Sequence, residues 1–404
     1  MAKLRIDHVD VAGKRVLMRV DFNVPLKDGK ITDDTRIAAA LPSIKSVLER
    51  QGRLVLMSHL GRPEGKGHEP AYSLEPCAKR LAELLGKSVR GGVKFPSHDC
   101  VDGAATAAVN MLADGECVLL ENLRFHKGEQ KGDPEFARKL AAHGDVYCND
   151  AFGTCHRPDV SMVGCPKMMT GKPKCCGFLV EKEIRYLSEA VRAPRKPFSV
   201  VLGGAKVSDK LPAIEFLLPK ADVIVVGGAM AYTFLKAQGF RVGSSRVEEE
   251  RLQDAEKILK MAKAQGRQLM LPVDHVCARA FEENAPSEVF SGDIGDGWMG
   301  LDIGPQTLKA YAQTLSKSKT IVWNGPMGVF EWANFAAGTR GVAEAIASAT
   351  AEGATSIVGG GDSAAAAEQF GVAEKLSHVS TGGGASLEML SGKKFESVEL
   401  LDEA

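Results

Sequence analysis

The residues that end the apolar runs of this sequence constrain its fold and its ligands more than any other feature. Runs in the second half end in paired glycines, as in 200–204 (VVLGG) and 357–362 (IVGGGD). Runs in the first half end in charged or amide-bearing residues, as in 16–23 (VLMRVDFN) and 54–59 (LVLMSH). Ligands of open parallel sheets bind at the carboxyl ends of strands, so these endings indicate the chemistry. We expect the first half to hold a small anion with side chains and the second to let phosphates approach the backbone.

Length and charge limit the class of protein. At 404 residues the chain exceeds the ~250–300 residues that one core can serve, which predicts two domains. Its 51 basic and 51 acidic side chains cancel, which argues against nucleic-acid and membrane-surface partners. The N-terminus has no apolar segment typical of a signal peptide, and no apolar run reaches the ~18 residues of a membrane span. A cytoplasmic location is therefore predicted.

Helix-periodic segments alternate with apolar runs along the whole chain, which predicts repeated βαβ units. Helices are expected over 37–48, 74–85 with Ser73 as N-cap, 134–143, 180–191, 208–218, 251–264 and 334–350. The runs between them alternate little, as do strands of sheets that are covered on both faces. We predict an α/β protein with two doubly wound, Rossmann-like parallel-sheet domains, joined by a hinge helix and separated by an open cleft.

The domain boundaries are placed by composition. A polar, turn-rich stretch precedes the helix candidate 180–191, and a segment with two prolines follows it at 193–197. We expect the first domain to comprise 1–175 with the tail 391–404 packed back on it. The expected hinge helix spans 176–195, and the second domain spans 196–390.

Cationic side chains recur at or just past the expected strand ends of the first half. They are Arg36, His59, Arg62, Arg124 and Arg157. Arginine matches carboxylate and phosphate oxygens with a planar pair of donors. Asp21 and Asn23 lie beside this group and could bind a hydroxyl or orient the arginines. A small substrate with phosphate, carboxylate and hydroxyl groups would use them all.

Two strand-to-helix turns of the second half are candidate phosphate sites. The first carries Lys206 and Lys210, which add positive charge to a helix N-terminus. The second carries Asp362 and Ser363 after three glycines. A carboxylate there would repel phosphate unless Mg²⁺ stood between them, although Asp362 is also a plausible N-cap. A third glycine-rich turn, 381–384, precedes a short helix.

Other motifs are weaker. The chain has no P-loop, and the G-x-G-x-x-G match at 295–300 lacks a preceding strand and a following helix, so it does not indicate a dinucleotide site. The nine cysteines form no C-x-x-C pair. Five of them cluster with His156 at residues 148–176, including the adjacent Cys175 and Cys176. A metal site is one interpretation, but the irregular spacing favours free, buried thiols.

Eight segments together resemble the phosphoglycerate kinase family, in order and over essentially the whole chain. They are 20–25 (VDFNVP), 58–63 (SHLGRP), 121–126 (ENLRFH), 150–157 (DAFGTCHR), 203–210 (GGAKVSDK), 323–331 (WNGPMGVFE), 359–363 (GGGDS) and 380–384 (STGGG). The resemblance implies reversible phosphoryl transfer from 1,3-bisphosphoglycerate to ADP, giving 3-phosphoglycerate and ATP in glycolysis. It also implies Mg²⁺, hinge-bending closure and a monomer.

The resemblance also implies residue roles. Asp21, Asn23, Arg36, His59, Arg62, Arg124 and Arg157 would bind phosphoglycerate. Gly203, Lys206, Lys210, Gly227, Gly228, Gly300, Leu301, Asn324, Pro326, Glu331, Gly360, Gly361, Asp362 and Ser363 would bind the nucleotide, with Glu331 on the ribose and Asp362 on the metal. Arg36 and Lys206 would flank the migrating group, helped by backbone amides near Gly361 and Gly384.

Three positions depart from the family pattern, in which Thr, Ala and Gly are usual. Here they are Ser363, Cys155 and Ala229. Ser363 keeps the hydroxyl group, whereas Ala229 would hinder close approach to the backbone.

Two other interpretations remain open from the residues alone. A two-lobed binding protein would explain the basic first half, but not the lysines, glycines and aspartate of the second. A dehydrogenase would use the same kind of sheet, but the chain has no credible dinucleotide motif.

Overall fold

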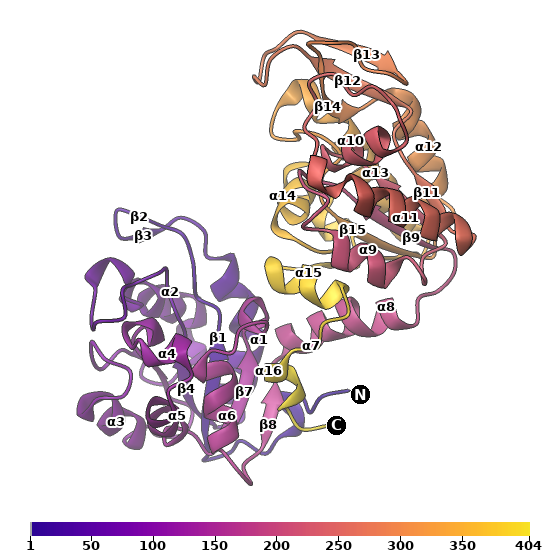
Figure 1. The fold of residues 1–404 in the computed structure, drawn as a ribbon. Coiled ribbons are helices and arrows are strands. Elements are labelled where there is room, and N and C mark those ends of the chain that lie inside the picture. The colour runs from indigo at the N-terminus through magenta and orange to yellow at the C-terminus, as the bar shows by residue number, and fades with distance from the viewer. Residues whose placement is uncertain (1) are drawn as a thin grey trace. The chain divides into compact units, whose positions relative to one another are not determined.

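The computed structural model describes residues 2–404 and divides into two compact units (Figure 1). The first unit contains the chain up to Arg185 together with Lys394–Ala404, and the second unit is Tyr186–Lys393. The helix expected over 180–191 is present as α7 (Phe178–Ile184), a π-helical turn η7 (Arg185–Glu189) and α8 (Ala190–Arg192). The division between the units falls within this helical segment.

The first unit is built on a parallel sheet with strand order β5-β6-β4-β1-β7-β8. The strands are β1 (Arg15–Val20), β4 (Arg53–Met57), β5 (Val93–Lys94), β6 (Cys117–Leu119), β7 (Val146–Asp150) and β8 (Lys174–Cys176); β2 (Leu26–Lys27) and β3 (Lys30–Ile31) form a separate hairpin. The chain begins at the middle of the sheet and adds strands on both sides. This doubly wound order matches the predicted fold class.

The helices of the first unit, besides α7, are α1 (Thr35–Glu49), α2 (Glu75–Leu85), α3 (Gly103–Asn110), α4 (Gly128–Lys131), α5 (Pro134–Ala141), α6 (Cys165–Met168) and α16 (Glu396–Glu399). Of these, α1, α2 and α5 lie where the sequence predicted helices, and the others were not predicted. Short turns are η1 (Ile6–His8), η2 (Pro70–Tyr72), η3 (Gly86–Ser88), η4 (Leu123–Phe125), η5 (Phe152–Thr154) and the π-helical η6 (Val160–Gly164).

The N-cap predicted at Ser73 is wrong, because α2 begins at Glu75 and Leu74 is its N-cap residue. The Ser73 hydroxyl still accepts a 3.2 Å hydrogen bond from the Glu75 amide. It also donates a 2.7 Å hydrogen bond to the buried Glu121 carboxylate. The buried carboxylate thus holds the Ser73 hydroxyl two residues before the first residue of the helix.

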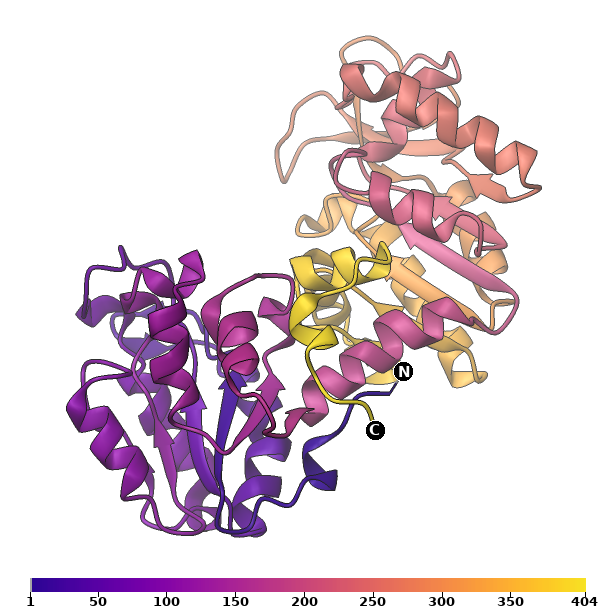
Figure 2. The ribbon, with the colours of Figure 1, turned by 60° about the horizontal axis from the view of Figure 1, so that its bottom comes forward.

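The two chain ends pair with each other in the first unit. The amide of Leu4 donates to the carbonyl of Asp402 at 2.8 Å, and the amide of Ala404 donates to that of Ala2 at 3.0 Å. Figure 2 shows the N and C labels close together beside this unit. The tail is further held where Asp402 accepts a 2.8 Å hydrogen bond from the amide of Lys174 at the start of β8.

The second unit has a parallel sheet with order β11-β10-β9-β15-β16-β17. Its strands are β9 (Phe198–Leu202), β10 (Val223–Val226), β11 (Gln268–Met270), β15 (Thr320–Asn324), β16 (Thr355–Val358) and β17 (His378–Val379). In chain order this is the arrangement of dinucleotide-binding sheets, with its topological switch between β9 and β15. Ligands of such sheets bind at the carboxyl ends beside the switch.

A three-stranded antiparallel sheet, which was not predicted, adds to the second unit. It has the order β13-β12-β14, from β12 (Asp274–Ala278), β13 (Ser287–Ser291) and β14 (Met299–Ile303). The strand β13 is mostly exposed, so it lacks the apolar signal of the other strands. It precedes the 295–300 motif, which corrects the expectation that no strand does. A strand rather than a helix follows, so the motif still lacks dinucleotide-binding context.

The helices of this unit are α9 (Leu211–Leu217), α10 (Met230–Ala237), α11 (Leu252–Ala264), α12 (Pro305–Leu315), α13 (Ala337–Ala351), α14 (Gly361–Gln369) and α15 (Gly384–Leu390), with short turns η8 (Glu249–Arg251), η9 (Ala333–Phe335) and η10 (Ala373–Lys375). The helix expected from 208 begins only at Leu211. The amide and hydroxyl of Ser208 instead donate to Glu248, at 3.0 and 2.6 Å, and hold the preceding residues as a turn.

Two further sequence expectations concern thiols and membranes. All nine cysteines are buried and unpaired, as the spacing favoured, and this includes Cys175 and Cys176. None of the helices among residues 2–404 combines the length and apolar character that crossing a bilayer requires.

The N-terminus of helix α12 is capped by a side chain of strand β12. Asp274 of β12 accepts hydrogen bonds from the amides of Gln306 and Thr307, at 2.9 and 2.8 Å, and from the Thr307 hydroxyl at 2.6 Å. A Cβ atom at Gly304 would lie 2.2 Å from Cγ of Asp274, although the backbone at Gly304 has an ordinary φ of -81°. The glycine is therefore required by this capping contact.

We expect Gly304→Ala to destabilise the second unit by about 1–3 kcal/mol, because the methyl group displaces the capping carboxylate. Gly295→Ala is the matched control, since its Cβ would meet only ordinary contacts at 3.6 Å or more. All three tryptophans belong to the second unit, so urea unfolding followed by tryptophan fluorescence reports on it. Equal midpoints for the two variants would contradict this account.

Candidate active site

The predicted anion-binding side chains of the first unit gather at the carboxyl edge of its sheet. Asp21 follows β1, His59 follows β4, Arg124 lies in η4 just past β6, and Arg157 follows η5 beyond β7. Arg36 lies in the first turn of α1, and Arg62 is exposed on the loop after β4. We call Asp21, Asn23, Arg36, His59, Arg62, Arg124 and Arg157 the basic site.

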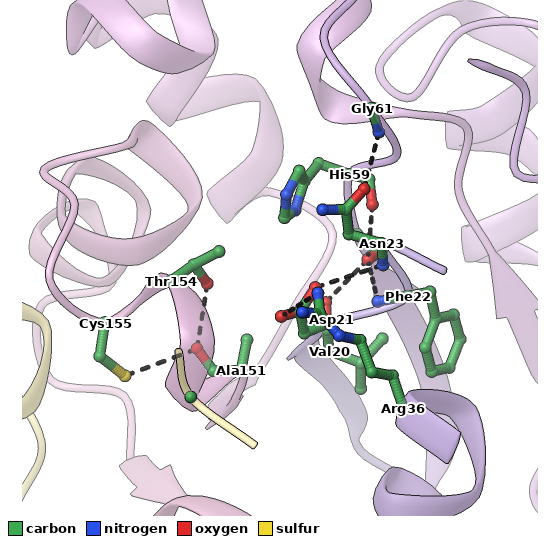
Figure 3. Close-up of polar contacts among 12 residues, drawn as sticks. Val20, Asp21, Phe22, Asn23, Arg36, His59, Gly61, Ala151, Thr154 and Cys155 are labelled. Atoms are coloured by element: carbon green, nitrogen blue, oxygen red, sulfur yellow. Dashed lines mark hydrogen bonds and ion pairs between the residues drawn. The ribbon is translucent and has the colours of Figure 1, made fainter. Parts of the chain in front are cut away.

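Direct contacts join several members of the basic site (Figure 3). The Arg36 guanidinium pairs with the Asp21 carboxylate at 3.1 Å. The Asn23 side chain accepts a 2.8 Å hydrogen bond from the amide of Gly61, and Arg124 donates at 2.9 Å to the carbonyl of the same residue. Gly61 is thus held from both sides, which fixes the loop between His59 and Arg62.

Buried guanidinium nitrogens in this site have no hydrogen-bond partner among the described residues. They are Nε and one terminal nitrogen of Arg124 and Nε of Arg157. The carboxylate of Asp159 lies 3.8 Å from Arg124, too far for a hydrogen bond. Burial is the main cause of the lowered pKa of Arg124, and the charges of Arg157 and Arg19 act in the same direction. Unpaired buried donors of this kind favour an anionic ligand.

Arg19 orients His59 and was not among the predicted site residues. Arg19 lies in β1 with 0% of its surface exposed, and its guanidinium is 3.0 Å from Nδ1 of His59. A guanidinium can only donate, so Nδ1 accepts and the imidazole proton resides on Nε2. Arg19 also donates a 2.9 Å hydrogen bond to Ser161, whose hydroxyl donates to the buried Glu129 at 2.6 Å. An arginine inside the apolar run 16–20 was the available signal.

The imidazole of His59 is kept neutral by its surroundings. Burial lowers its pKa well below the ordinary value, and the charges of Arg19, Arg124, Arg157 and Arg36 lower it further. At neutral pH the ring therefore presents one Nε2–H donor and no positive charge.

Cys155, where the family usually has alanine, is a structural thiol. It is 2% exposed, and its Sγ lies 3.6 Å from the Ala151 carbonyl (Figure 3). Burial raises the pKa of Cys155 to about 12, so it is not a thiolate at neutral pH. Its carbonyl accepts a 2.7 Å hydrogen bond from Ser397 of α16, within the same unit. The substitution is accommodated in the core.

The second unit contains a cavity of about 440 Å³ at the carboxyl edge of its sheet. This volume is in the range of small-molecule sites. Its lining includes six of the predicted nucleotide residues: Gly228, Gly300, Leu301, Pro326, Glu331 and Asp362. Ala229 also lines it, so the departure from glycine lies at the cavity wall.

The paired glycines also have a packing role in this structure. The amides of Gly203 and Gly204 donate to the carbonyls of Asn324 and Pro326, at 3.0 and 2.9 Å. A Cβ at Gly203 would lie 2.0 Å from the Pro326 carbonyl oxygen. The amides of Gly227 and Gly228 are likewise used, by Leu202 and Met327 at 2.8 Å each. These glycines let the ends of neighbouring strands pack together, so their amides are not free for phosphate.

A polar network at the switch between β9 and β15 joins other predicted residues. Nζ of Lys210 donates to the side chain of Asn324, which in turn donates to the carbonyl of Gly359. The Ser363 hydroxyl accepts a 2.6 Å hydrogen bond from the amide of Gly325. Burial lowers the pKa of Lys210, while the charges of Asp209 and Asp362 oppose this effect.

The remaining predicted residues lie outside the cavity lining but at the same edge. Lys206 is exposed on the loop after β9. Gly361 and Gly384 are the first residues of α14 and α15, and Gly360 is the N-cap of α14. The amides of a helix's first turn have no intrahelical partner, so these helix starts can receive an anion.

Several lining residues were missed by sequence reasoning. They are Ser244, Arg246, Phe281, Met299 and Val329. Phe281 is 62% exposed, and its ring centroid lies 4.6 Å from that of Trp332. Phe281 and Met299 come from the antiparallel sheet and its loop, which the strand pattern did not reveal. Ser244, Arg246 and Val329 come from loops after α10 and β15.

Known proteins match this chain along its whole length. The model of the family described as phosphoglycerate kinase matches residues 6–393. A phosphoglycerate kinase of Rhodopirellula baltica is 55% identical over 408 residues, covering 100% of each chain. One of Thermosipho africanus is 53% identical, covering 98% of this chain and 97% of the relative. The solved structure of phosphoglycerate kinase from Coxiella burnetii aligns with a TM-score of 0.90 at 40% identity, covering 98% of each chain.

Two Rossmann-like units, one with a basic site and one with a glycine-rich cavity, define a two-domain phosphotransferase. The chain belongs to the phosphoglycerate kinase family. It is therefore a kinase, which overturns the two alternative interpretations of the sequence as a binding protein or a dehydrogenase.

The neutral His59 makes a prediction about pH. Its pKa is lower in the folded chain than in the unfolded one, so below about pH 6.5 the unfolded state binds the extra proton. The first unit should therefore lose stability as the pH falls, by up to about 1.4 kcal/mol per pH unit from this group. In His59→Gln this contribution should disappear.

The unmodified chain and His59→Gln can be compared in urea between about pH 7 and pH 5. Unfolding of the first unit is followed by the hydrogen exchange of β1 amides, corrected for their intrinsic exchange rates. His143 in the same unit also has a lowered pKa and contributes equally to both chains, so only the difference between them reports on His59. An equal loss of stability in the unmodified chain and in His59→Gln would show that His59 is not held neutral.

Proposed function

We propose that this member of the phosphoglycerate kinase family performs its reversible, ATP-generating phosphoryl transfer by a direct, in-line step. The step would take place between 1,3-bisphosphoglycerate and ADP and give 3-phosphoglycerate and ATP. The observation that carries the proposal is the set of buried, unpartnered donors of Arg124 and Arg157 at one sheet edge. Such donors fit a small ligand that carries both a phosphate and a carboxylate.

The basic site is proposed to bind the phosphoglycerate. Arg62, Arg124 and Arg157 would hold its phosphate, and the Nε2–H of His59 would donate to an oxygen of the ligand. Asp21 and Asn23 would bind the hydroxyl group, since each keeps an acceptor at the same edge. The first unit would then be the phosphoglycerate-binding domain.

The second unit is proposed to be the nucleotide-binding domain, with the phosphates at the start of α14. Lys210 would contact the phosphates, and Glu331 at the cavity wall would bind the ribose. The exposed Asp362 fits a magnesium ligand, because it lines the cavity and its charge reaches Lys210. Mg²⁺ bound there with the nucleotide would neutralise phosphate charge.

No general base is needed in this mechanism. The acceptor in the ATP-consuming direction is a carboxylate, which is ionised at neutral pH. Catalysis would rest on positioning and on charge stabilisation of the transferred group. Arg36 and Lys206 would flank that group, assisted by the amides of Gly361 and Gly384.

Substrates held on separate units require closure, for which the helical segment 178–192 is the proposed hinge. Closure would exclude water and limit hydrolysis. The monomeric state and the cytoplasmic location stay predictions of the sequence.

We expect Arg36→Ala to reduce ATP formation from 1,3-bisphosphoglycerate and ADP by about 10²–10³-fold, as for removal of a charge-stabilising donor. Arg138→Ala removes another exposed, paired arginine of the first unit and should leave the rate unchanged. The assay is run with and without Mg²⁺. Binding of 3-phosphoglycerate without any turnover in the unmodified chain would refute the proposal.

Lys206→Ala should lower kcat by about 10²-fold or more while changing each KM little, because the interaction is made mainly in the transition state. The matched control is Lys260→Ala, which removes an exposed lysine of α11 that pairs with Glu256. Steady-state kinetics with both substrates varied separates the two constants. A rise in KM at constant kcat would make Lys206 a residue for uniform substrate binding.

A further inference from the structure

Three potential metal ligands from three separate segments meet in the first unit, and none of them belongs to the basic site. They are His68 on the loop between β4 and α2, His98 on the loop between β5 and α3, and Glu121 just past β6. One ligand atom from each lies within 4.8 Å of the others. The two imidazole rings are close, with centroids 4.3 Å apart, and Nε2 of His68 is 3.6 Å from Oε2 of Glu121.

Glu121 has the properties of a ligand that is held ready. Its side chain is 0% exposed. Oε1 accepts hydrogen bonds from the amides of Leu74 and Asn122, at 2.8 and 2.7 Å, and Oε2 accepts one from the Ser73 hydroxyl. Oε2 keeps a lone pair on the side of His68. Such second contacts orient ligating carboxylates in metal sites.

The charge of Glu121 is poorly compensated. Among residues 2–404, the only lysine, arginine or histidine side chain within 4.0 Å of this carboxylate is that of His68. Its separation of 3.6 Å is long for an ion pair with a direct hydrogen bond. A buried carboxylate without a full partner is costly, and a bound cation would remove that cost.

We propose that His68, His98 and Glu121 form a binding site for a divalent transition-metal ion such as Zn²⁺. Two imidazoles and one carboxylate are a ligand set of zinc, with water in the fourth position. Tetrahedral bonds of about 2.0–2.1 Å place ligand atoms about 3.4 Å apart. The 3.6 Å between His68 and Glu121 is near that value, and the other pairs of ligand atoms lie within 4.8 Å, so side-chain rotations of the histidines would complete the site.

The ligand types select the class of metal. Imidazole suits zinc and its neighbours in the first transition series, whereas Mg²⁺ and Ca²⁺ prefer oxygen ligands. Both histidines are exposed, so the ion has an entry path from solvent and the rings can rotate. The site is thus distinct in chemistry from the magnesium position proposed at Asp362.

A second group of ligand types lies nearby and is the weaker candidate. It comprises Asp99, Cys100 and His126. Nε2 of His126 already lies 2.9 Å from Asp99. The Cys100 thiol is fully buried, and burial raises its pKa well above the ordinary value, with the charge of Asp99 acting in the same direction. Zinc requires the thiolate, so this group is poorly prepared to bind it.

Metal binding at His68, His98 and Glu121 would join three loops of the first unit. Asn122, next to Glu121, donates 2.8 Å hydrogen bonds to the carbonyls of Leu60 and Tyr72, at the two ends of the loop that carries His68. The ion would therefore tie this loop to the end of β6. Occupancy should stabilise the first unit without contributing a ligand to the basic site.

The test is a titration of the whole chain with Zn²⁺ alone, monitored by isothermal titration calorimetry. We expect one ion per chain in the unmodified protein, and at least about 100-fold weaker binding in His68→Ala and in His98→Ala. His8→Ala is the matched control, since its side chain is 60% exposed and belongs to neither group, and it should bind as the unmodified chain does. Excess Mg²⁺ should not displace the ion.

Cobalt provides a second readout that does not depend on the variants. Co²⁺ in the proposed site should give visible ligand-field absorption without a sulfur-to-cobalt charge-transfer band. A charge-transfer band would assign binding to Cys100 instead and overturn the proposal. So would absence of stoichiometric binding, or unchanged affinity in both histidine variants. Metal-free melting curves verify that each variant is folded, which is expected because both histidines are exposed.

Discussion

Parallel pairing of the strands is the constraint on which both the basic site and the cavity of the second unit depend. Parallel neighbours can only be joined by crossovers, and in each unit these bring every carboxyl end to one edge of the sheet. Asp21, His59 and Arg124 follow three different strands of the first sheet and still meet at that edge. In the second sheet the same constraint brings Gly203 beside Asn324 at the switch between β9 and β15. Residues far apart in the chain thus become neighbours without any specific attraction between them.

Electrostatics in the first unit follow from that convergence. Several guanidinium groups lie together at one edge, and their charges lower the pKa values of His59 and Arg124. This repulsion is unfavourable for the fold, and Asp21 offsets it only for Arg36. An anionic ligand relieves it. The same feature that weakens the ligand-free unit therefore favours binding.

The sequence predicted most of the fold because its strands are apolar and its helices periodic. It predicted both parallel sheets and the residues at their carboxyl ends, because a strand end can be located without knowing the contacts. It did not predict the sheet formed by β12, β13 and β14, whose exposed strand lacks an apolar pattern.

Contacts between distant residues lay beyond the reach of pattern reasoning. Arg19 was overlooked because its role depends on Ser161 and His59, which lie far from it in the chain. The sequence pattern also did not reveal that Gly203 and Gly228 permit close packing between strand ends. The lining residue Phe281 belongs to a loop without any motif.

The pairing of the two chain ends has a consequence for how the molecule is made. The second unit, Tyr186–Lys393, is an insertion between the two pieces of the first. During synthesis it emerges and can fold while the first unit still lacks its final segment. The first unit becomes complete only after Lys394–Ala404 have been made, so the unit that begins first is completed after the second.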